Sequence, residues 1–136
     1  MGFVYSEITL KNVNDQIMAK NGNIKDEDVR TVTVNALADT GAYTLVINED
    51  IREKLGLEIT GKRHRKLADG KRSLYDTAGP LEICWKDRRF IMEALIIPDG
   101  ENTLLGALPL EGLDLIVDPV KQELTGAHGE EMLYYV

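Results

Sequence analysis

The residues best suited to chemistry are Asp39, Thr40 and Gly41. An apolar run, Ala36–Ala38, leads into them, and a second apolar run, Leu45–Ile47, follows shortly after. A turn tripeptide normally lies among polar residues at the surface, where an aspartate costs little free energy. Here the carboxylate lies between two segments that we expect to be buried, and burying a charge is costly unless a partner satisfies it or its pKa moves. Asp39 is therefore a candidate for acid–base chemistry.

A second motif follows 65 residues further on, where Leu104, Leu105 and Gly106 stand together. Two hydrophobic residues followed by glycine form a signature that retroviral-type aspartic proteases carry near the end of each subunit. With Asp-Thr-Gly at 39–41, the order and spacing of the two motifs resemble the retropepsin-like (clan AA) aspartic proteases, in a bacterial single-domain form. The resemblance covers Thr31 to Leu124, which is most of the chain.

Aspartic proteolysis needs two carboxyl groups, so close together that one stays protonated while the other acts as base on a shared water. The base takes a proton as the water attacks a peptide carbonyl, and the acid stabilises the oxyanion. The chain has one Asp-Thr-Gly, and the segments 69–70, 76–79 and 99–100 do not repeat it with the same apolar flanks. Activity would therefore require a symmetric homodimer in which each subunit supplies Asp39.

The resemblance implies a role for each residue of the first motif. Asp39 would be the catalytic residue, Thr40 would hydrogen-bond across the two-fold axis, and Gly41 would let backbone N–H groups approach the carboxylate. Ala42 fits the small residue that the family has at this point. Tyr43 departs from the small or short polar residue of many members, and its ring could narrow the cleft.

Asp-Gly between strand-like flanks predicts a hairpin at residues 69–70. In the family, a hairpin at this point is the flap that closes over substrate, so Ala68, Asp69 and Gly70 would contact the substrate backbone. The segment lacks the multiple glycines of retroviral flaps.

The elements that must position these residues are short strands and turns. Alternating or continuous apolar residues predict strands at 4–10, 32–38, 45–47, 81–85, 90–97, 113–117 and 121–124. A helix is predicted between its N-cap Asn48 and Gly56, and a shorter one at 109–111. We therefore predict an all-β domain, a small closed acid-protease barrel with one or two short helices and one lobe per chain.

The 136 residues predict a single domain, residues 1–136, with two unusual segments. A polar insertion at 11–29 is either a long loop or contains a one- or two-turn helix, capped by Asp15 and reaching Lys20. The tail at 128–136 ends in apolar residues, so we expect it to pack on the domain or across a dimer seam. Trp85 is expected in the core or at that seam.

Composition excludes several classes of function. The net charge of −7 argues against nucleic-acid binding, and no apolar run approaches the 18 residues of a membrane span. His64 and His128 lie far apart in the sequence, so we expect neither a metal site nor a cofactor. A single Cys84 and the lack of signal-peptide features near the first residue predict a cytoplasmic location.

One segment is positively charged, although the chain as a whole is negative. Residues 62–72 hold six Lys or Arg against one Asp, a local charge of +5, so the rest of the chain carries −12. Such a segment is ordinarily a solvated strand edge that deters pairing with other strands. The alternative is that Lys62, Arg63, Arg65 and Lys66 favour acidic residues in a bound peptide.

The leading hypothesis is a homodimeric aspartic endopeptidase that binds an extended peptide or protein substrate beneath two flaps. The alternative within the same fold is a catalytically silent, dimeric peptide- or protein-binding module that keeps Asp39 for hydrogen bonds at the dimer core. A third hypothesis is an interaction domain whose apolar C-terminal tail docks a partner.

Overall fold

A computed structural model describes residues 3–133 of the chain. Its strands are β1 (Val4–Asn12), β2 (Thr31–Ala38), β3 (Leu45–Asn48), β4 (Glu58–Lys66), β5 (Arg72–Trp85), β6 (Arg88–Ile97), β7 (Leu104–Leu105), β8 (Leu115–Asp118) and β9 (Glu123–Gly126). Its helices are α1 (Val13–Lys20), the 3₁₀ turn η1 (Asp26–Asp28), α2 (Glu49–Leu55) and α3 (Ala107–Gly112). Within the described part of the chain, no helix is long and apolar enough to cross a membrane.

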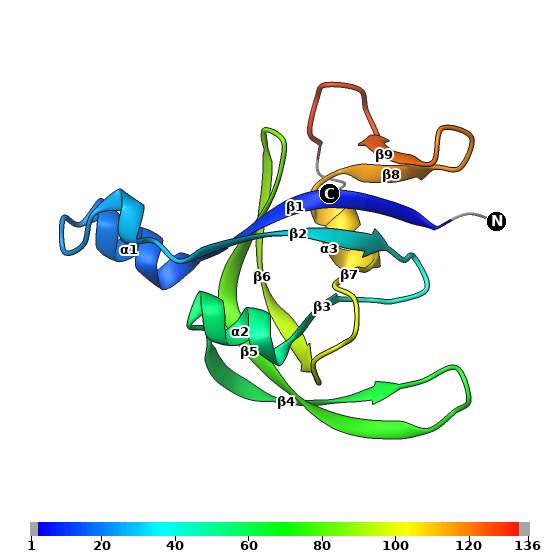
Figure 1. The fold of residues 1–136 in the computed structure, drawn as a ribbon. Coiled ribbons are helices and arrows are strands. Elements are labelled where there is room, and N and C mark those ends of the chain that lie inside the picture. The colour runs from blue at the N-terminus through cyan, green and yellow to red at the C-terminus, as the bar shows by residue number, and fades with distance from the viewer. Residues whose placement is uncertain (1–2, 134–136) are drawn as a thin grey trace.

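Seven strands form one sheet in the order β1-β2-β7-β3-β6-β5-β4, and β1 also pairs with β5. This last pairing closes six of the strands into a barrel. Among the described strands, β4 stays outside the barrel and pairs with β5 alone. The β4–β5 hairpin, residues 58–78, therefore extends from the barrel wall (Figure 1). The predicted all-β barrel is confirmed, although three α-helices form where one or two were predicted.

The barrel interior is filled by the apolar side chains that alternate along its strands. Ile8 and Leu10 of β1, Leu81 and Ile83 of β5, and Leu105 of β7 are all almost completely buried. Each fully buried side chain of this size contributes about 1.5–3 kcal/mol relative to exposure. Trp85 belongs to this core, as predicted, and its indole Nε1 donates to Ser6 Oγ over 3.0 Å.

Helix α2 follows its local sequence signals. Asn48 Oδ1 accepts a hydrogen bond from the Ile51 N–H over 2.9 Å, which caps the helix as predicted. The helix ends at Gly56, whose φ of 62° lies in the left-handed region that favours glycine. Ile51 and Leu55, one turn apart, both face the core.

The insertion at 11–29 contains helix α1, but the predicted cap is wrong. Asn12, not Asp15, is the N-cap, and its Oδ1 accepts from the Asp15 N–H over 2.9 Å. Asp15 is buried and pairs with Arg30, which donates to it from Nε at 2.8 Å and from Nη2 at 2.9 Å. These bonds hold the pKa of Asp15 below its usual value against the opposing effect of burial.

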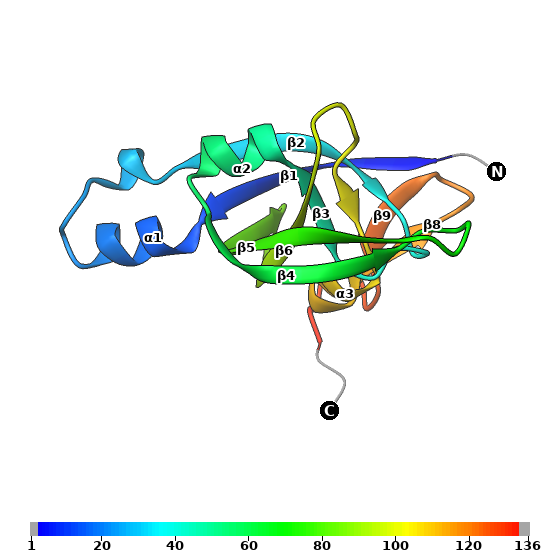
Figure 2. The same ribbon diagram turned by 90° about the horizontal axis from the view of Figure 1, so that it is seen from below.

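The insertion lies at one end of the barrel, and the loop that carries Asp39 lies at the other (Figures 1 and 2). Asn12 joins the insertion to the barrel, because its Nδ2 donates to the Leu55 carbonyl at the end of α2 over 2.8 Å. The insertion is therefore a fixed extension of the barrel at a distance from the predicted site.

After α3, the hairpin β8–β9 forms a separate two-stranded sheet. Its strands begin two residues later than predicted, because α3 and its C-cap extend through Leu113. The described part of the tail, 128–133, folds back through polar contacts. Asp114 Oδ2 lies 2.7 Å from His128 Nδ1 and accepts from the Leu133 N–H over 3.0 Å. Residues 134–136 of the predicted apolar tail lie outside the described residues.

Candidate active site

Asp39 lies at the start of the loop that joins β2 to β3, residues 39–44. The run after the motif, 45–47, is buried, whereas only Ala36 is buried in the run before it. Asp39 is half-buried, and its neighbours Thr40 and Gly41 are exposed. The expectation that Asp39 is enclosed is therefore wrong for a single chain, because the loop leaves the barrel before it turns back. One carboxylate oxygen, Oδ1, accepts a hydrogen bond from the Gly41 N–H over 2.9 Å.

The second motif, residues 104–106, and the start of α3 are hydrogen-bonded to the backbone of this loop. Strand β7 pairs in parallel with β2, and the Asp39 N–H donates to the Leu105 carbonyl over 3.0 Å. Three consecutive N–H groups at the start of α3 then donate to loop carbonyls, over 2.7 to 3.1 Å: Gly106 to Thr44, Ala107 to Ala42 and Leu108 to Tyr43. The sequence thus brings both predicted motifs into direct backbone contact.

Gly106 is the closest point of this contact. A Cβ atom at Gly106 would lie 2.4 Å from the Thr44 carbonyl oxygen and 2.8 Å from that of Ala42. Both neighbours are backbone atoms, which cannot rotate away as a side chain can. A glycine is therefore required here by close approach.

An open cleft of about 600 Å³ lies in front of the Asp39 loop. Residues 39 and 41–44 form one wall, and residues 63–68 of the β4–β5 hairpin form the opposite wall. Val46, Leu95 and Leu104 line the base between them. The cleft therefore combines a carboxylate, an apolar base and a basic hairpin.

The predicted flap residues are only partly in this cleft. Ala68 lines it, whereas Asp69 and Gly70 lie at the hairpin tip, where Asp69 Oδ1 accepts from the Lys71 N–H over 2.9 Å. Gly70 has a φ of 86° and open space around it, as expected of a turn glycine. The hairpin is present, but its cleft wall is formed mainly by β4.

The apolar cluster at the base of the cleft was not predicted from the sequence. Val46, Leu95 and Ile97 form a small second apolar cluster on the outer face of the barrel, next to Tyr75 and Leu104. The available signal was the unbroken apolar run at 94–97, which is buried throughout. A strand apolar on both faces indicates that something covers its outer side, here the hairpin.

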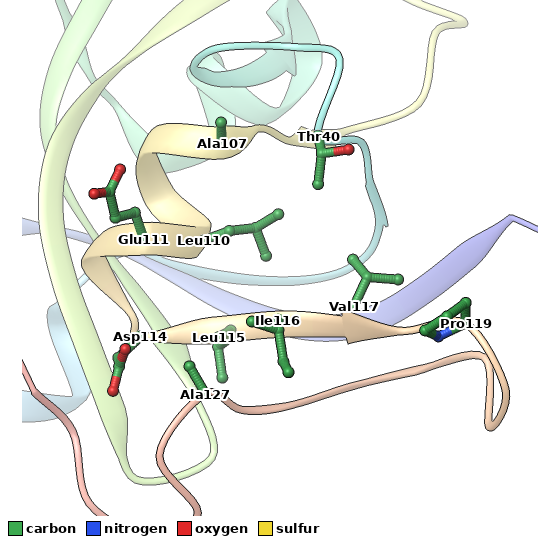
Figure 3. A pocket seen from close by; sticks show the side chains of 10 residues that line it. All are labelled: Thr40, Ala107, Leu110, Glu111, Asp114, Leu115, Ile116, Val117, Pro119 and Ala127. Atoms are coloured by element: carbon green, nitrogen blue, oxygen red, sulfur yellow. The ribbon is translucent and has the colours of Figure 1, made fainter.

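A second cavity of about 530 Å³ lies beside the first motif. Thr40 lies at one side of it, and Ile116, Val117 and Pro119 of the β8 segment lie across from Thr40 (Figure 3). Leu110 and Leu115 contribute further apolar surface, and Ile116 is 52% exposed. In both ribbon views the Asp39 loop, the hairpin tip and the turn between β8 and β9 lie toward the same side of the molecule.

In the described part of the chain, neither a metal-binding cluster nor a reactive thiol forms a competing site. Among residues 3–133, no three His, Cys, Asp or Glu side chains are grouped as a metal site would require. Burial and a 3.1 Å contact with Glu82 Oε1 raise the pKa of Cys84 to about 11, which leaves its thiol protonated and unreactive at neutral pH.

The closed barrel, with an Asp-Thr-Gly loop braced by a Leu-Leu-Gly segment, has a retropepsin-like fold. EIAV protease, solved in complex with the inhibitor HBY-793, is similar over 81% of this chain and 86% of its own, with a TM-score of 0.54 and 20% identity. The retroviral protease-like domain of Ddi1 from Leishmania major is similar over 100% of this chain and 95% of its own, with a TM-score of 0.58 and 16% identity. The sequence matches no protein-family model and no curated protein. At these identities the likeness is one of fold, and it confirms the resemblance inferred from the two motifs at that level.

Proposed function

We propose that the protein is an aspartic endopeptidase that acts as a homodimer. The observation that carries the proposal is the position of the Asp39 carboxylate. It lies at the wall of an open cleft of about 600 Å³, on a loop that residues 105–108 hold through four backbone hydrogen bonds.

In the proposed mechanism, two Asp39 carboxyl groups face each other across a two-fold axis. Repulsion between them keeps one proton on the pair, so one carboxylate is the base for a water and the other group is the acid. The water attacks the scissile carbonyl as the base takes its proton, and the acid stabilises the oxyanion. The Gly41 N–H, 2.9 Å from Asp39 Oδ1, fixes the orientation of each carboxylate.

The apolar cavity beside Thr40 supports a dimer that forms around the first motif. Thr40 is exposed, and the surface next to it includes Ile116, which is 52% exposed. In a symmetric dimer the same surface of each copy meets its counterpart, so burial of this patch would bring the two Asp39 loops together. The Thr40 hydroxyl would then hydrogen-bond to the facing loop.

The substrate proposed for the cleft is an extended peptide. The hairpin presents strand β4, which within residues 3–133 pairs only with β5, so its other edge has N–H and C=O groups available to a peptide strand. Val46, Leu95 and Leu104 at the base would accept apolar side chains near the scissile bond. The single, unreactive Cys84 suits the reducing cytoplasm, which is the location we propose.

One observation favours a second candidate function. Tyr43 is 65% exposed and lines the cleft beside Asp39, where its ring reduces the space for a reacting peptide. In this alternative the same dimer binds peptides or proteins without cleaving them, and Asp39 serves in hydrogen bonds between the two loops.

The deciding experiment compares wild type with Asp39→Asn on a mixed pool of unfolded peptides between pH 4 and 7. We expect wild type to cleave, with a preference for the acidic side of that range, because the pair must hold one proton. Asparagine cannot act as base or acid, so Asp39→Asn should lose at least about 10²–10⁴-fold in rate. Sedimentation measured in parallel reports whether each protein is a dimer.

A matched control is Asp99→Asn, which removes one carboxylate outside the cleft and should retain cleavage. If wild type and Asp39→Asn are equally inert while both sediment as dimers, the endopeptidase proposal is wrong and the binding module replaces it. If wild type cleaves as a monomer at high dilution, the shared dyad is wrong.

A further inference from the structure

Two arginines of strand β4 share the face that looks into the cleft. Arg63 and Arg65 are two residues apart, so their side chains leave the strand on the same side, and both line the cleft with Asp39. Tyr75 lies opposite Arg63 in the β4–β5 register and packs against the Val46 and Leu95 cluster at the cleft base. The Arg65 guanidinium lies over the Tyr75 ring, 6.0 Å from its centre, at the outer limit of a cation–π contact.

The charges of these arginines are poorly neutralised. Among the described residues, Arg63 has no carboxylate within ion-pair distance, and the Arg65 Nη1 reaches only Glu101, at 3.8 Å. The neighbouring Lys62 is different, because it pairs with Asp76 over 2.8 Å and does not line the cleft. The four-residue basic set considered from the sequence is therefore divided: Lys62 lies outside the cleft, whereas Arg63, Arg65 and Lys66 line it and add positive charge to the cleft of a protein of net charge −7.

We propose that this cleft selects peptides that carry two acidic side chains in an acidic–any–acidic order. The inference rests on the proposed function, since it assigns the substrate class of that cleft. In an extended peptide, residues two apart lie about 7 Å from each other on one face, which matches the spacing of two arginines along β4. A guanidinium binds a carboxylate through two parallel N–H···O bonds, a geometry that a lysine does not provide.

Peptide binding is measured with Asp39→Asn, so that no substrate is consumed. Three labelled peptides share one apolar framework and contain Glu-Ala-Glu, Gln-Ala-Gln or Glu-Glu-Ala. At low salt we expect Glu-Ala-Glu to bind about 5- to 30-fold more tightly than Gln-Ala-Gln, with Glu-Glu-Ala between them. The difference should shrink in 0.5 M NaCl, because salt screens partly exposed charges.

Adding Arg63→Gln and Arg65→Gln to Asp39→Asn should abolish the preference for Glu-Ala-Glu. The matched control adds Lys71→Gln and Arg72→Gln, which remove the same charge from the same hairpin at positions outside the cleft. This control should keep the preference, which separates local recognition from the general field of the basic segment.

The proposal is overturned if the arginine variant keeps the preference, if the control loses it equally, or if neither Glu- nor Gln-containing peptide binds. Tighter binding of a single-stranded oligonucleotide than of Glu-Ala-Glu would also overturn it, and would assign the basic face to nucleic acid. A wild type that cleaves no peptide, while the arginine-dependent preference holds, disproves the endopeptidase and leaves this inference standing. If wild type cleaves peptides but shows no arginine-dependent preference, this inference is wrong and the endopeptidase proposal stands.

Discussion

The two walls of the cleft are held in different ways. The Asp39 loop, residues 39–44, is fixed by four hydrogen bonds from backbone groups of another part of the chain, residues 105–108. Among the described residues, the tip of the β4–β5 hairpin, residues 67–71, makes hydrogen bonds within its own turn. The Leu67 N–H donates to the Lys71 carbonyl, the Gly70 N–H to the Leu67 carbonyl and the Lys71 N–H to Asp69 Oδ1, each over 2.9 Å. One wall is part of the barrel, and the other is joined to it through β5 and through the packing of Tyr75 on the apolar cluster of Val46 and Leu95.

This difference matches what the proposed chemistry needs from each wall. A carboxylate that must meet its counterpart and a water has to be preorganised, and long-range backbone bonds supply that rigidity. A wall that must admit and then cover a peptide has to open, and few contacts with the barrel make opening inexpensive in free energy. The retained rigidity of the hairpin comes from cross-strand pairs such as Thr60 and Thr77, whose hydroxyl oxygens lie 3.0 Å apart.

The insertion at 11–29 extends the comparison, because it is also polar and also projects from the barrel. Its key aspartate, Asp15, is buried and accepts three hydrogen bonds from Arg30, one of them from the backbone N–H over 3.0 Å. The hairpin pair Lys62–Asp76 is a single contact between largely solvated groups. A charged segment can therefore be fixed or loose, depending on whether its charges are paired away from water.

The largest expected effect on stability comes from comparing one glycine substitution in each wall of the cleft. Gly106→Ala should lower the free energy of unfolding by about 3 kcal/mol or more, because the new Cβ would lie 2.4 Å from a backbone oxygen. Gly70→Ala should cost only about 1 kcal/mol, the strain of its φ of 86°, since nothing lies within 4 Å. Urea unfolding of both variants measures the two values. Equal losses would mean that the second motif does not hold the Asp39 loop more firmly than the hairpin tip is held.

The next effect tests the insertion. Asp15→Asn should destabilise the protein by about 1–3 kcal/mol at pH 7, since it removes charge-assisted hydrogen bonds at a buried site. Arg30 holds the pKa of Asp15 below its usual value, so the folded state favours the ionised form. The stabilisation is therefore complete above the unfolded pKa, about 3.9, and is lost as the pH falls through the lower folded pKa.

Urea unfolding of wild type and Asp15→Asn at several pH values checks this sign. The difference between the two proteins should be largest near pH 7 and should narrow below about pH 4. A difference that grows on acidification would show that Asp15 is not stabilised as a carboxylate, and that the insertion is held by other contacts.

The sequence predicted the features that depend on local signals. Apolar alternation set the barrel strands, and Asn48 with Gly56 set the limits of α2, because a cap and a left-handed glycine act within one turn of chain. The two motifs predicted the retropepsin-like fold because each is a short, specific segment. The spatial meeting of Gly106 with the carbonyl groups of residues 42 and 44 followed from that fold.

The sequence could not predict features that depend on distant partners. Asp15 looked like a helix cap, but its position opposite Arg30 is set by how the insertion folds back on itself. Lys62 and Arg63 were equivalent by composition, and only strand pairing places one beside Asp76 and the other in the cleft. Asp39 was expected to be enclosed because its flanks are apolar, whereas exposure depends on where the loop leaves the barrel.

The smallest expected effect on stability is that of the hairpin ion pair, Lys62–Asp76, which we compare with the buried Asp15–Arg30 pair of the insertion. Asp76→Asn removes the Lys62 contact, and both side chains are substantially solvated, at 64% exposure for Lys62 and 38% for Asp76. Such a pair contributes less than about 1 kcal/mol, and salt weakens it further. Urea unfolding at low salt should therefore show that Asp76→Asn lowers the free energy of unfolding by much less than Asp15→Asn does. In 1 M salt the effect of Asp76→Asn should vanish. A loss as large as that of Asp15→Asn would mean that the hairpin is anchored to the barrel by its charges, and the picture of a loosely attached wall would have to be abandoned.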